Sequence, residues 1–475
     1  MKMSLAILNP AFVRGCWSVC VLLLLTSSSL WAQFSTDREP LGPSSRKTGL
    51  VLTEIMYNPR PVPGLSTNLT HEFIEVFNSK PWDEDIGGFS IGGDVSYLFP
   101  TGTVLRAKSY LVVARVPGLI ETNYGATNVL GPWDGAETNR LSTERGVVQL
   151  RNRQGAVLLA VNYQDSPPWP EAADGTGHSL SLMRPSYGED DFRAWSESDS
   201  VGGTPGVAEP LTLDPLAHVL INEWRNHSDP DDWIELYNHS NIPVDLSGAW
   251  LSDDPTTNKF RIPTGTTIPA RGFVYWNQDT LGFELFAGGE TIFFWNAQQT
   301  RVIDVIDFRG QSNNVSSGRW PDGGPITYGL TTNTRGAPNA RPIRYPVVIN
   351  EIMFNPISGD SDDEYVELYN RTAQSVNISD WQFVVGIDYT FPTNMPAMPA
   401  GAYWVVAKNP TNLLAIYTNL TTNIVFGPYA GTLANGGERL TFTAADYDRI
   451  LVGGQQVIEK LPVPVSDLKI GRAHV

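Results

Sequence analysis

The chain has 475 residues, which is too long for a single hydrophobic core and suggests two to four domains. Charged residues make up only 17% and aromatic residues 11%, and the 43 glycines and 35 prolines indicate short strands joined by turns. This composition argues against long helices and against a disordered acidic chain, and the net charge of −17 disfavours nucleic acid as a partner.

Residues 1–32 are predicted to be an export signal. Lys2 and Arg14 supply positive charge, an apolar run covers residues 16–25, and Ala32 is a suitable residue before a cleavage site. The apolar run is too short to span a bilayer. We therefore expect cleavage, a secreted or cell-surface protein, and no transmembrane segment after cleavage.

The only two cysteines, Cys16 and Cys20, lie inside this predicted signal. Cleavage would leave a secreted chain without disulfides. Such a chain has to be held together by burial of its core, with bound ions as an alternative source of stability.

One pattern occurs three times along the chain. An apolar strand that contains a glutamate is followed by a second strand that contains another glutamate and ends in asparagine. Three paired matches in the same order indicate a tandem repeat. The paired segments are VLTEIMYNP (51–59) with EFIEVFN (72–78), VLINEW (219–224) with DWIELYN (232–238), and VVINEIMFNP (347–356) with EYVELYN (364–370).

The repeated segments read as strands. β-forming residues dominate them, and polar residues interrupt at strand spacing and not at helical spacing. A later apolar strand recurs in register at 110–113, 273–276 and 403–406. Short strands with glycine, proline, asparagine and aspartate turns at near-regular spacing are typical of a β-sandwich, and no window predicts an amphipathic helix. The fold class is predicted to be all-β.

The domain limits are predicted where turn-rich segments end a repeat. Residues 202–206 close the first copy and residues 335–339 close the second. The third copy has no counterpart of Gly318–Gly323, so we expect this copy to be truncated and the natural protein to continue beyond Leu468. The predicted domains are 48–207, 216–340 and 346–475.

The opening I-N-E-I-M-x-N-P, the second strand E-[FY]-[IV]-E-[LV]-[YF]-N, a L-S-x-W segment and the closing G-R-x-P-D-G…G-x-P-N resemble bacterial lamin-tail domains. The first copy departs from this pattern at two positions. Phe89 stands where tryptophan is usual, and Thr53 stands where asparagine is usual. The resemblance implies tandem immunoglobulin-like β-sandwich domains that bind or tether and do not catalyse. In bacteria such domains occur in exported multidomain proteins, sometimes beside kinase-like spore-coat or nuclease domains.

No catalytic constellation is found in the sequence. None of the six histidines forms a His-Glu-x-x-His motif, and there is no G-x-S-x-G elbow, Walker loop or dinucleotide fingerprint. We therefore predict no enzyme, no catalytic residue and no cofactor-binding residue within the residues present. His178, in a Gly-Thr-Gly-His-Ser turn, is expected to be solvated or to stabilise the turn. Packing is favoured over sugar stacking for four tryptophans near turns: Trp133, Trp169, Trp295 and Trp320.

The repeated glutamates are the best site candidates. The favoured interpretation is structural, in which each pair caps backbone groups or pairs with an arginine at the sandwich edge. A metal or ligand contact is the alternative. The pairs are Glu54 with Glu75, Glu223 with Glu235, and Glu351 with Glu367.

Two acidic loops are weaker candidates. Closely spaced carboxylates suit Ca²⁺, although neither loop has the spacing of an EF-hand. We predict solvated loops with no bound metal or cofactor, and calcium stays the alternative. The residues concerned are Asp229, Asp231, Asp232, Asp360, Asp362 and Asp363.

Two functions follow from these observations. The first is a non-catalytic secreted or cell-surface module that binds an unknown protein or a surface polysaccharide through loops at the sandwich ends. The second is the non-catalytic N-terminal part of a larger exported enzyme, with a kinase-like spore-coat or nuclease domain downstream.

Overall fold

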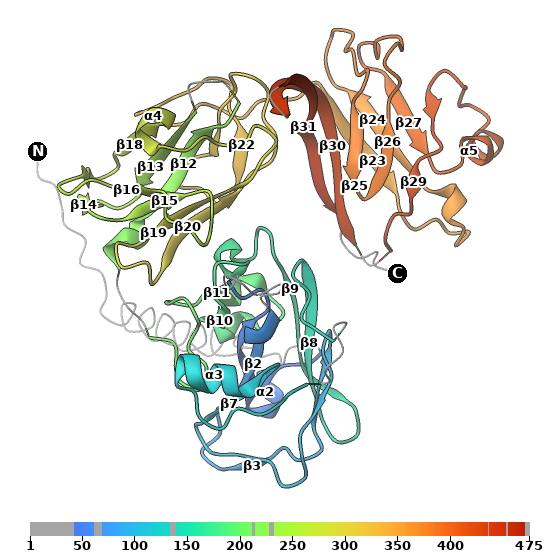
Figure 1. Ribbon diagram of the computed structural model, residues 1–475. Coiled ribbons are helices and arrows are strands. Elements are labelled where there is room, and N and C mark those ends of the chain that lie inside the picture. The colour runs from blue at the N-terminus through green and yellow to red at the C-terminus, as the bar shows by residue number, and fades with distance from the viewer. Residues whose placement is uncertain are drawn as a thin grey trace, which may run out of the picture.

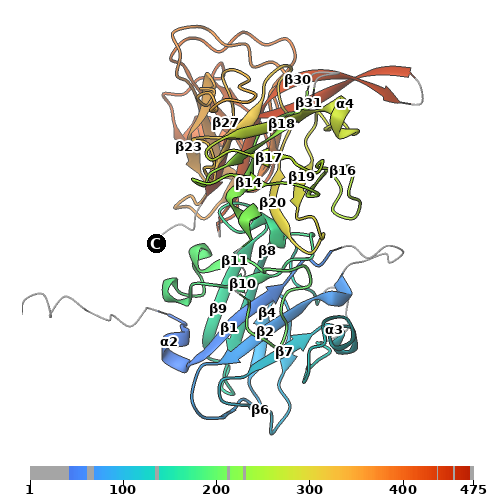
Figure 2. The same cartoon turned by 90° about the vertical axis from the view of Figure 1, so that its left-hand side faces the viewer.

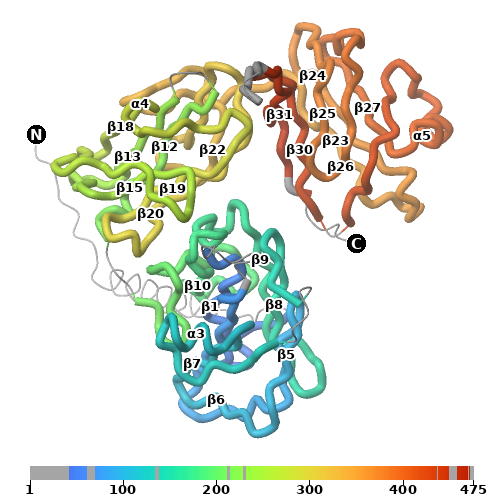
Figure 3. Tube along the Cα trace, viewed as in Figure 1, coloured from blue at the N-terminus to red at the C-terminus, as the bar shows by residue number. Residues whose placement is uncertain are grey.

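The computed structural model describes residues 42–60, 69–133, 139–210, 214–227, 232–435, 437–452 and 455–470. These residues form three β-sandwich modules, seen as separate bodies of ribbon in Figure 1 and as a continuous trace in Figure 3. None of the described helices is both long and apolar enough to cross a membrane. The predicted signal at 1–32, with both cysteines, lies outside the described residues.

The first module packs two main sheets face to face. Their strand orders are β11-β10-β1-β2-β7 and β5-β4-β8-β9, and β3 pairs with β6. Side chains from both sheets meet in one core around Leu52, Ile74, Val148 and Leu159. The elements are α2 (Ser45–Thr48), β1 (Leu50–Met56), η1 (Leu69–His71), β2 (Phe73–Asn78), β3 (Glu84–Asp85), β4 (Ser90–Gly93), β5 (Tyr97–Leu98), β6 (Val104–Leu105), β7 (Tyr110–Ala114), α3 (Pro117–Tyr124), β8 (Arg145–Arg151), β9 (Val157–Gln164), η2 (Glu171–Ala173), β10 (Leu180–Leu182), η3 (Pro185–Tyr187), η4 (Phe192–Ala194) and β11 (Trp195–Glu197).

The second module repeats this plan. Its sheets have the orders β18-β13-β12-β21-β22 and β16-β15-β19-β20, and β14 pairs with β17. Its core includes Ile221, Leu236, Leu251 and Phe294. The elements are η5 (Pro215–His218), β12 (Val219–Arg225), β13 (Trp233–Asn238), β14 (Val244–Asp245), β15 (Trp250–Ser252), β16 (Phe260–Arg261), β17 (Thr267–Ile268), β18 (Phe273–Asn277), α4 (Gln278–Leu281), β19 (Thr291–Trp295), β20 (Val302–Asp307), β21 (Ser317–Arg319) and β22 (Thr327–Gly329).

The third module has the sheets β23-β24-β27-β28 and β29-β26-β25-β30-β31. Its core includes Ile349, Leu368, Phe383 and Phe442. The elements are β23 (Val347–Met353), η6 (Ser361–Asp363), β24 (Tyr365–Asn370), β25 (Gln382–Val385), β26 (Ile387–Thr390), β27 (Tyr403–Ala407), α5 (Pro410–Ile416), β28 (Val425–Phe426), β29 (Ala430–Gly431), β30 (Glu438–Val452) and β31 (Gln455–Ile470).

The first two strands of every module form the same hairpin. β1–β2, β12–β13 and β23–β24 are antiparallel, and each first strand carries a β-bulge just before its glutamate. A bulge inserts one extra residue and re-aims the side chains that follow it. The result places the two glutamates of each copy directly opposite each other: Glu54 with Glu75, Glu223 with Glu235, and Glu351 with Glu367.

The other edge of the first strand differs between modules. β1 pairs with β10, and β12 pairs with β21, so both strands lie inside a sheet. β23 pairs only with β24 within the described part of the third module, so it is an edge strand. The same chain thus contains two closed copies and one open copy of one sandwich.

The third module also has a long β-hairpin. β30 and β31 have 15 and 16 residues, whereas their counterparts β19 and β20 have five and six. Figure 2 shows this hairpin extending beyond the rest of the third module. It contacts the second module, where Asn313 N–H donates to Asp446 Oδ2 at 3.0 Å.

The all-β prediction is confirmed. The sequence analysis did not predict the short helices that the structure contains. The longest described helix, α3, has eight residues and falls in the insertion after β7. α5 occupies the corresponding place in the third module. Each helix starts with proline near its N-terminus, a position where the missing N–H costs nothing.

Candidate functional site

The paired glutamates of the second module hold the segment that closes it. Glu223 Oε1 accepts from the Ser316 hydroxyl at 2.6 Å and from Thr334 N–H at 3.0 Å. Glu223 Oε2 accepts from the Thr334 hydroxyl at 2.8 Å. Glu235 Oε2 accepts from Gly336 N–H at 2.5 Å. One carboxylate pair therefore fixes both β21, which follows Ser316, and the Thr-x-Gly turn.

The first module is closed by the same donors in the same order. The Ser179 hydroxyl and Thr204 N–H, the latter at 2.9 Å, donate to Glu54 Oε1. Gly206 N–H donates to Glu75 Oε2 at 2.6 Å. Two segments far apart in the chain thus share one motif, a serine just before the added strand and a Thr-x-Gly turn after it.

All four of these glutamates are buried, and burial raises their pKa values. The pKa of Glu235 is raised to about 8 and that of Glu75 to about 7. Burial also raises the pKa of Glu54 and of Glu223. Their partners are hydroxyls and backbone amides, so they cap backbone groups as the structural interpretation holds. The structural interpretation also allowed pairing with an arginine. Within the described residues none of these four glutamates pairs with an arginine.

The glutamate pair of the third module is open. Glu351 is exposed and accepts from the Tyr365 hydroxyl at 2.7 Å. Glu367 Oε1 accepts from the Asn350 side-chain amide at 2.8 Å. No serine, threonine or glycine donor of the closing kind reaches either carboxylate in the described part of this module. The pair has the same backbone register as its two counterparts but not their ligands.

The carboxylates of the second acidic loop are held by neighbouring polar groups. Asp360 Oδ1 accepts from Asp362 N–H and caps η6. Asp362 Oδ2 accepts from the Asn409 side chain at 3.0 Å, and Asp363 Oδ1 accepts from the Asn412 side chain at 2.6 Å. Amide donors at the start of α5 thus take oxygen positions that a calcium ion would need.

In the other acidic loop only one residue can be placed. Asp232 is buried, and its Oδ2 accepts from Leu285 N–H at 3.0 Å. Asp229 and Asp231 lie outside the described residues. Across the described residues no cluster of three or more histidine, cysteine, aspartate or glutamate side chains is arranged to hold a metal ion.

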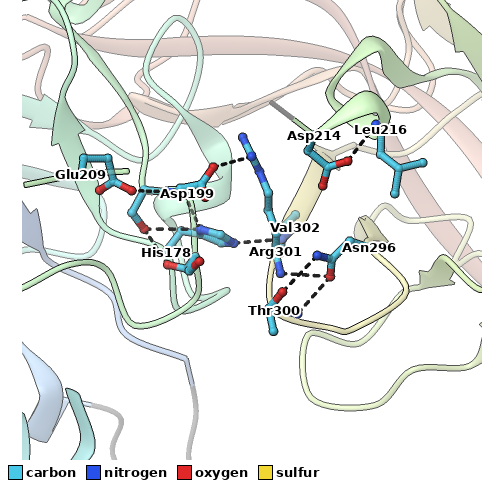
Figure 4. Close-up of polar contacts among 11 residues, drawn as sticks. His178, Asp199, Glu209, Asp214, Leu216, Asn296, Thr300, Arg301 and Val302 are labelled. Carbon is cyan, nitrogen blue, oxygen red and sulfur yellow. Dashed lines mark hydrogen bonds and ion pairs between the residues drawn. The ribbon is translucent and has the colours of Figure 1, made fainter. Parts of the chain in front are cut away.

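His178 lies in the junction between the first and second modules (Figure 4). Its side chain is 0% exposed, so the expectation that it could be solvated is wrong. Nδ1 donates to the carbonyl oxygen of Ser198 at 2.7 Å, and Nε2 accepts from Val302 N–H at 2.9 Å. Burial lowers its pKa to about 4, which keeps the ring neutral and Nε2 able to accept.

Further contacts surround His178 and fix the two modules to each other. Arg301 forms an ion pair with Asp199 at 2.5 Å (Figure 4). Val201 N–H donates to the carbonyl oxygen of Thr300 at 2.9 Å. Apolar side chains from both modules also form one cluster. These residues are Ala172, Val201, Trp250, Phe293, Trp295, Val302 and Val305.

A cleft of about 450 Å³ lies between the second and third modules. Tyr328 and Tyr345 line it together with Arg371 and Arg439. Arg439 forms an ion pair with Asp467, and Arg371 Nε donates to the carbonyl oxygen of Tyr345 at 2.8 Å. Aromatic rings beside fixed polar groups are the usual lining of a ligand site. No sequence motif indicated this cleft, because its walls come from two different modules and join residues as far apart as Tyr328 and Asp467.

Packing is confirmed for three of the four tryptophans near turns. Trp133 and Trp295 are 1% exposed, and Trp169 is 7% exposed. Trp320 is different, with 41% of its surface exposed beside the turn that leads into β22. It is the one member of this set whose ring is open to solvent.

One family model, described as Lamin Tail Domain, matches three stretches of the chain, residues 43–165, 214–336 and 343–452. Each stretch begins before the first hairpin of one module. No curated protein and no solved structure matches the chain.

Proposed function

Because the chain belongs to the lamin tail domain family, with three tandem copies, we propose that it is an exported, non-catalytic tether whose sandwiches act as one rigid body. Its partner in this proposal is a protein or a surface polysaccharide. Export rests on the pattern of residues 1–32, and tethering rests on the packing of the modules.

The observation that carries this proposal is the junction between the first and second modules. Flexible linkers let domains move independently, whereas a buried interface with directional bonds fixes their relative orientation. Here a buried histidine, an ion pair and a shared apolar cluster join the two modules. The third module adds contacts to both, since Arg145 donates to the Gly437 carbonyl oxygen at 2.7 Å and Asn313 contacts Asp446.

The buried glutamates support a non-catalytic role. Glu54, Glu75, Glu223 and Glu235 are engaged by hydroxyls and backbone amides of their own module. A general acid or base has to reach a substrate. The repeated carboxylates of the closed modules instead hold the fold together.

The cleft between the second and third modules is the proposed binding surface. Tyr328 and Tyr345 offer rings for stacking, and Arg371 and Arg439 offer donors for hydroxyl or carboxylate groups. A partner bound there would touch two modules at once. Its orientation relative to the tether would then be set by the rigid arrangement of the modules.

Rigidity can be tested by distance measurement between spin labels. The chain without residues 1–32 contains no cysteine, so labels can be placed at Gln154→Cys and Asp279→Cys, which are exposed positions in the first and second modules. We expect one narrow distance distribution. A broad distribution in the otherwise unaltered chain would refute the rigid tether.

Binding can be tested on glycan arrays and on washed cell envelopes. We expect retention that falls in a Tyr328→Ala variant and persists in Tyr417→Ala, a matched control because both tyrosines are 39% exposed. Equal retention of the two variants would exclude the cleft as the binding surface. Export is tested separately by fusing residues 1–32 to a reporter that is active only outside the cytoplasm.

A further inference from the structure

We propose that His227 and Asp448 form an acid-operated clasp that fixes the long hairpin of the third module onto the second module. His227 follows β12 of the second module, and Asp448 lies in β30, one strand of the hairpin seen in Figure 2. Protonation of the histidine joins the two side chains, and loss of the proton releases them. The clasp adds to the other contacts of the third module, and it depends neither on export nor on a ligand.

The ring of His227 is buried with one of its two nitrogens unsatisfied. The residue is 3% exposed. Nδ1 lies 2.8 Å from the carbonyl oxygen of Gln311, which can only accept, so Nδ1 carries a proton and donates it. In the neutral ring Nε2 is then an acceptor, and no donor among the described residues reaches it. A buried polar atom without a partner is unfavourable, and a proton on Nε2 would give it one.

The group that faces Nε2 is a carboxylate from another module. Asp448 Oδ1 lies 3.5 Å from His227 Nε2. Both atoms are acceptors while the ring is neutral, so they cannot form a hydrogen bond. A proton turns Nε2 into a charged donor, and such a donor binds a carboxylate at about 2.8 Å. The clasp therefore closes with a shift of less than about 1 Å.

The alternation of side chains along β30 aims Asp448 at the second module. Asp446, two residues earlier on the same face of the strand, accepts from Asn313 N–H of the second module at 3.0 Å. Tyr447, between them, donates its hydroxyl to Asp380 within the third module at 3.2 Å. The hairpin is thus bonded on both faces, and the contact at Asp448 is the one that meets a buried histidine.

Other charged groups on the segments that meet here do not replace the histidine as partner of Asp448. Lys460 donates to Gln382 Oε1 within the third module at 2.8 Å. Arg309 lies near Asp307 and Asp467. Glu459 is opposite Asp448 across the hairpin, so it adds negative charge beside the clasp. The charged residues of these segments are Arg225 after β12 begins, Arg309 before Gln311, Asp446 and Asp448 of β30, and Glu459 and Lys460 of β31.

The clasp lies beside the cleft between the second and third modules. Gln311, whose carbonyl oxygen holds His227, lines the cleft. Residues 463–467 of β31, the partner strand of β30, form part of the opposite wall. Closing the clasp draws this wall towards the second module, so the cleft should be narrower in acid. Only the effect of this change on a bound ligand rests on the proposed function.

Spin labels on the second and third modules measure the clasp. In the chain without residues 1–32 they can be placed at Asp279→Cys and Thr390→Cys, which are exposed positions. From about pH 7.5 to about pH 5.5, where histidines commonly change charge, the ratio of the narrow to the broad part of the distance distribution should rise about tenfold, because a charge-assisted hydrogen bond forms. His178 stays neutral in this range, because burial lowers its pKa to about 4.

Variants separate the clasp from a general effect of acid. His227→Gln cannot take up a proton, and Asp448→Asn can donate to the neutral Nε2, so each should abolish the pH response. His218→Gln replaces an exposed histidine of the same module and is the matched control, which should keep the tenfold response. A second measurement needs no variant. The ring-nitrogen chemical shifts of His227 should show a proton on Nδ1 alone at the alkaline end and on both nitrogens at the acid end.

Three results would overturn the proposal. One is a distance distribution of the unaltered chain that does not change between the two pH values. Another is a full pH response in His227→Gln. The last is a neutral ring that carries its proton on Nε2 at about pH 7.5, because the pair would then be bonded without acid. None of these results bears on labels in the first and second modules, so the rigid tether is tested independently.

Discussion

The second and third modules share one hairpin and differ in what completes it. Both place two glutamates opposite each other after a β-bulge. In the second module Ser316, Thr334 and Gly336 donate to that pair and bury it. In the third module the pair lies at an open strand edge. Within the described residues, the same pair of opposed glutamates is therefore buried where a segment about 100 residues away donates to it and exposed where Tyr365 and Asn350 are its partners.

The largest expected effect comes from removing the glutamate of the closed pair. Glu223→Ala leaves the Ser316 hydroxyl and Thr334 N–H without their buried acceptor, and should destabilise the second module by about 3 kcal/mol. Glu351→Ala removes an exposed carboxylate and should change stability by less than about 0.5 kcal/mol. Denaturant unfolding followed by module-resolved hydrogen exchange measures both. Equal losses in the two variants would contradict the difference between the modules.

The comparison extends to the junctions of the second module. A buried histidine locks it to the first module, whereas a cleft lies between it and the third beside polar contacts such as Asn313 with Asp446. His178→Ala leaves Val302 N–H unpaired and creates a cavity, so it should destabilise the junction by about 2 kcal/mol. The spin-label distance distribution across that junction should broaden, while His218→Ala, at an exposed histidine, should leave it narrow.

The same histidine makes the junction sensitive to acid. The pKa of His178 is lowered by burial from an ordinary value of 6.5 to about 4. The unfolded ring takes up a proton between these values and the folded ring does not, so stability rises with pH across this window. The junction should therefore weaken as the pH falls from 6.5 towards 4. A distance distribution that is equally narrow at both ends of the window would exclude this role.

A pH effect of opposite sign is expected inside the second module. Burial raises the pKa of Glu235 from an ordinary value of 4.5 to about 8. The folded state holds the proton that the unfolded state releases, so stability falls as the pH rises from 4.5 to 8. Glu235→Gln keeps an acceptor for Gly336 and cannot ionise, so it should remove most of this pH dependence. The comparison of stability at pH 5 and pH 8 for both proteins measures it.

The smallest expected effect is that of calcium. Asn409 and Asn412 donate to Asp362 and Asp363, and these contacts occupy oxygens that an ion would need. Addition of Ca²⁺ should therefore give no binding heat and no shift in the melting of the third module. A saturable heat that Asp363→Ala abolishes would show that the loop opens to take an ion.

Much of the fold could be predicted from local patterns. The β-branched and aromatic residues of segments such as Phe73–Phe77 identify strands, because these side chains pack well on a pleated surface. The sequence also predicted the position of each repeated glutamate. It favoured a structural role for these glutamates, which the closed pairs have. α3 was missed because its eight residues contain a single buried side chain, Ile120, and so have no amphipathic pattern.

The candidate sites between modules could not be predicted. His178 follows glycines in a segment that looks like a solvated turn, and its burial depends on Val302, which is 124 residues away. The cleft that contains Tyr328 and Arg371 likewise forms only when two modules pack together. Local sequence carries no signal for contacts of this kind, because neither wall is a recognisable motif by itself.

Amide hydrogen exchange along β12 and β23 in one sample tests the difference between the closed and the open module most directly. The two strands have matching sequences, and the added strand β21 is present on only one of them. Residues 223–225 should exchange slowly and residues 351–353 rapidly, because the latter have no partner strand on that edge. Equal, strong protection of both segments would contradict an open third module.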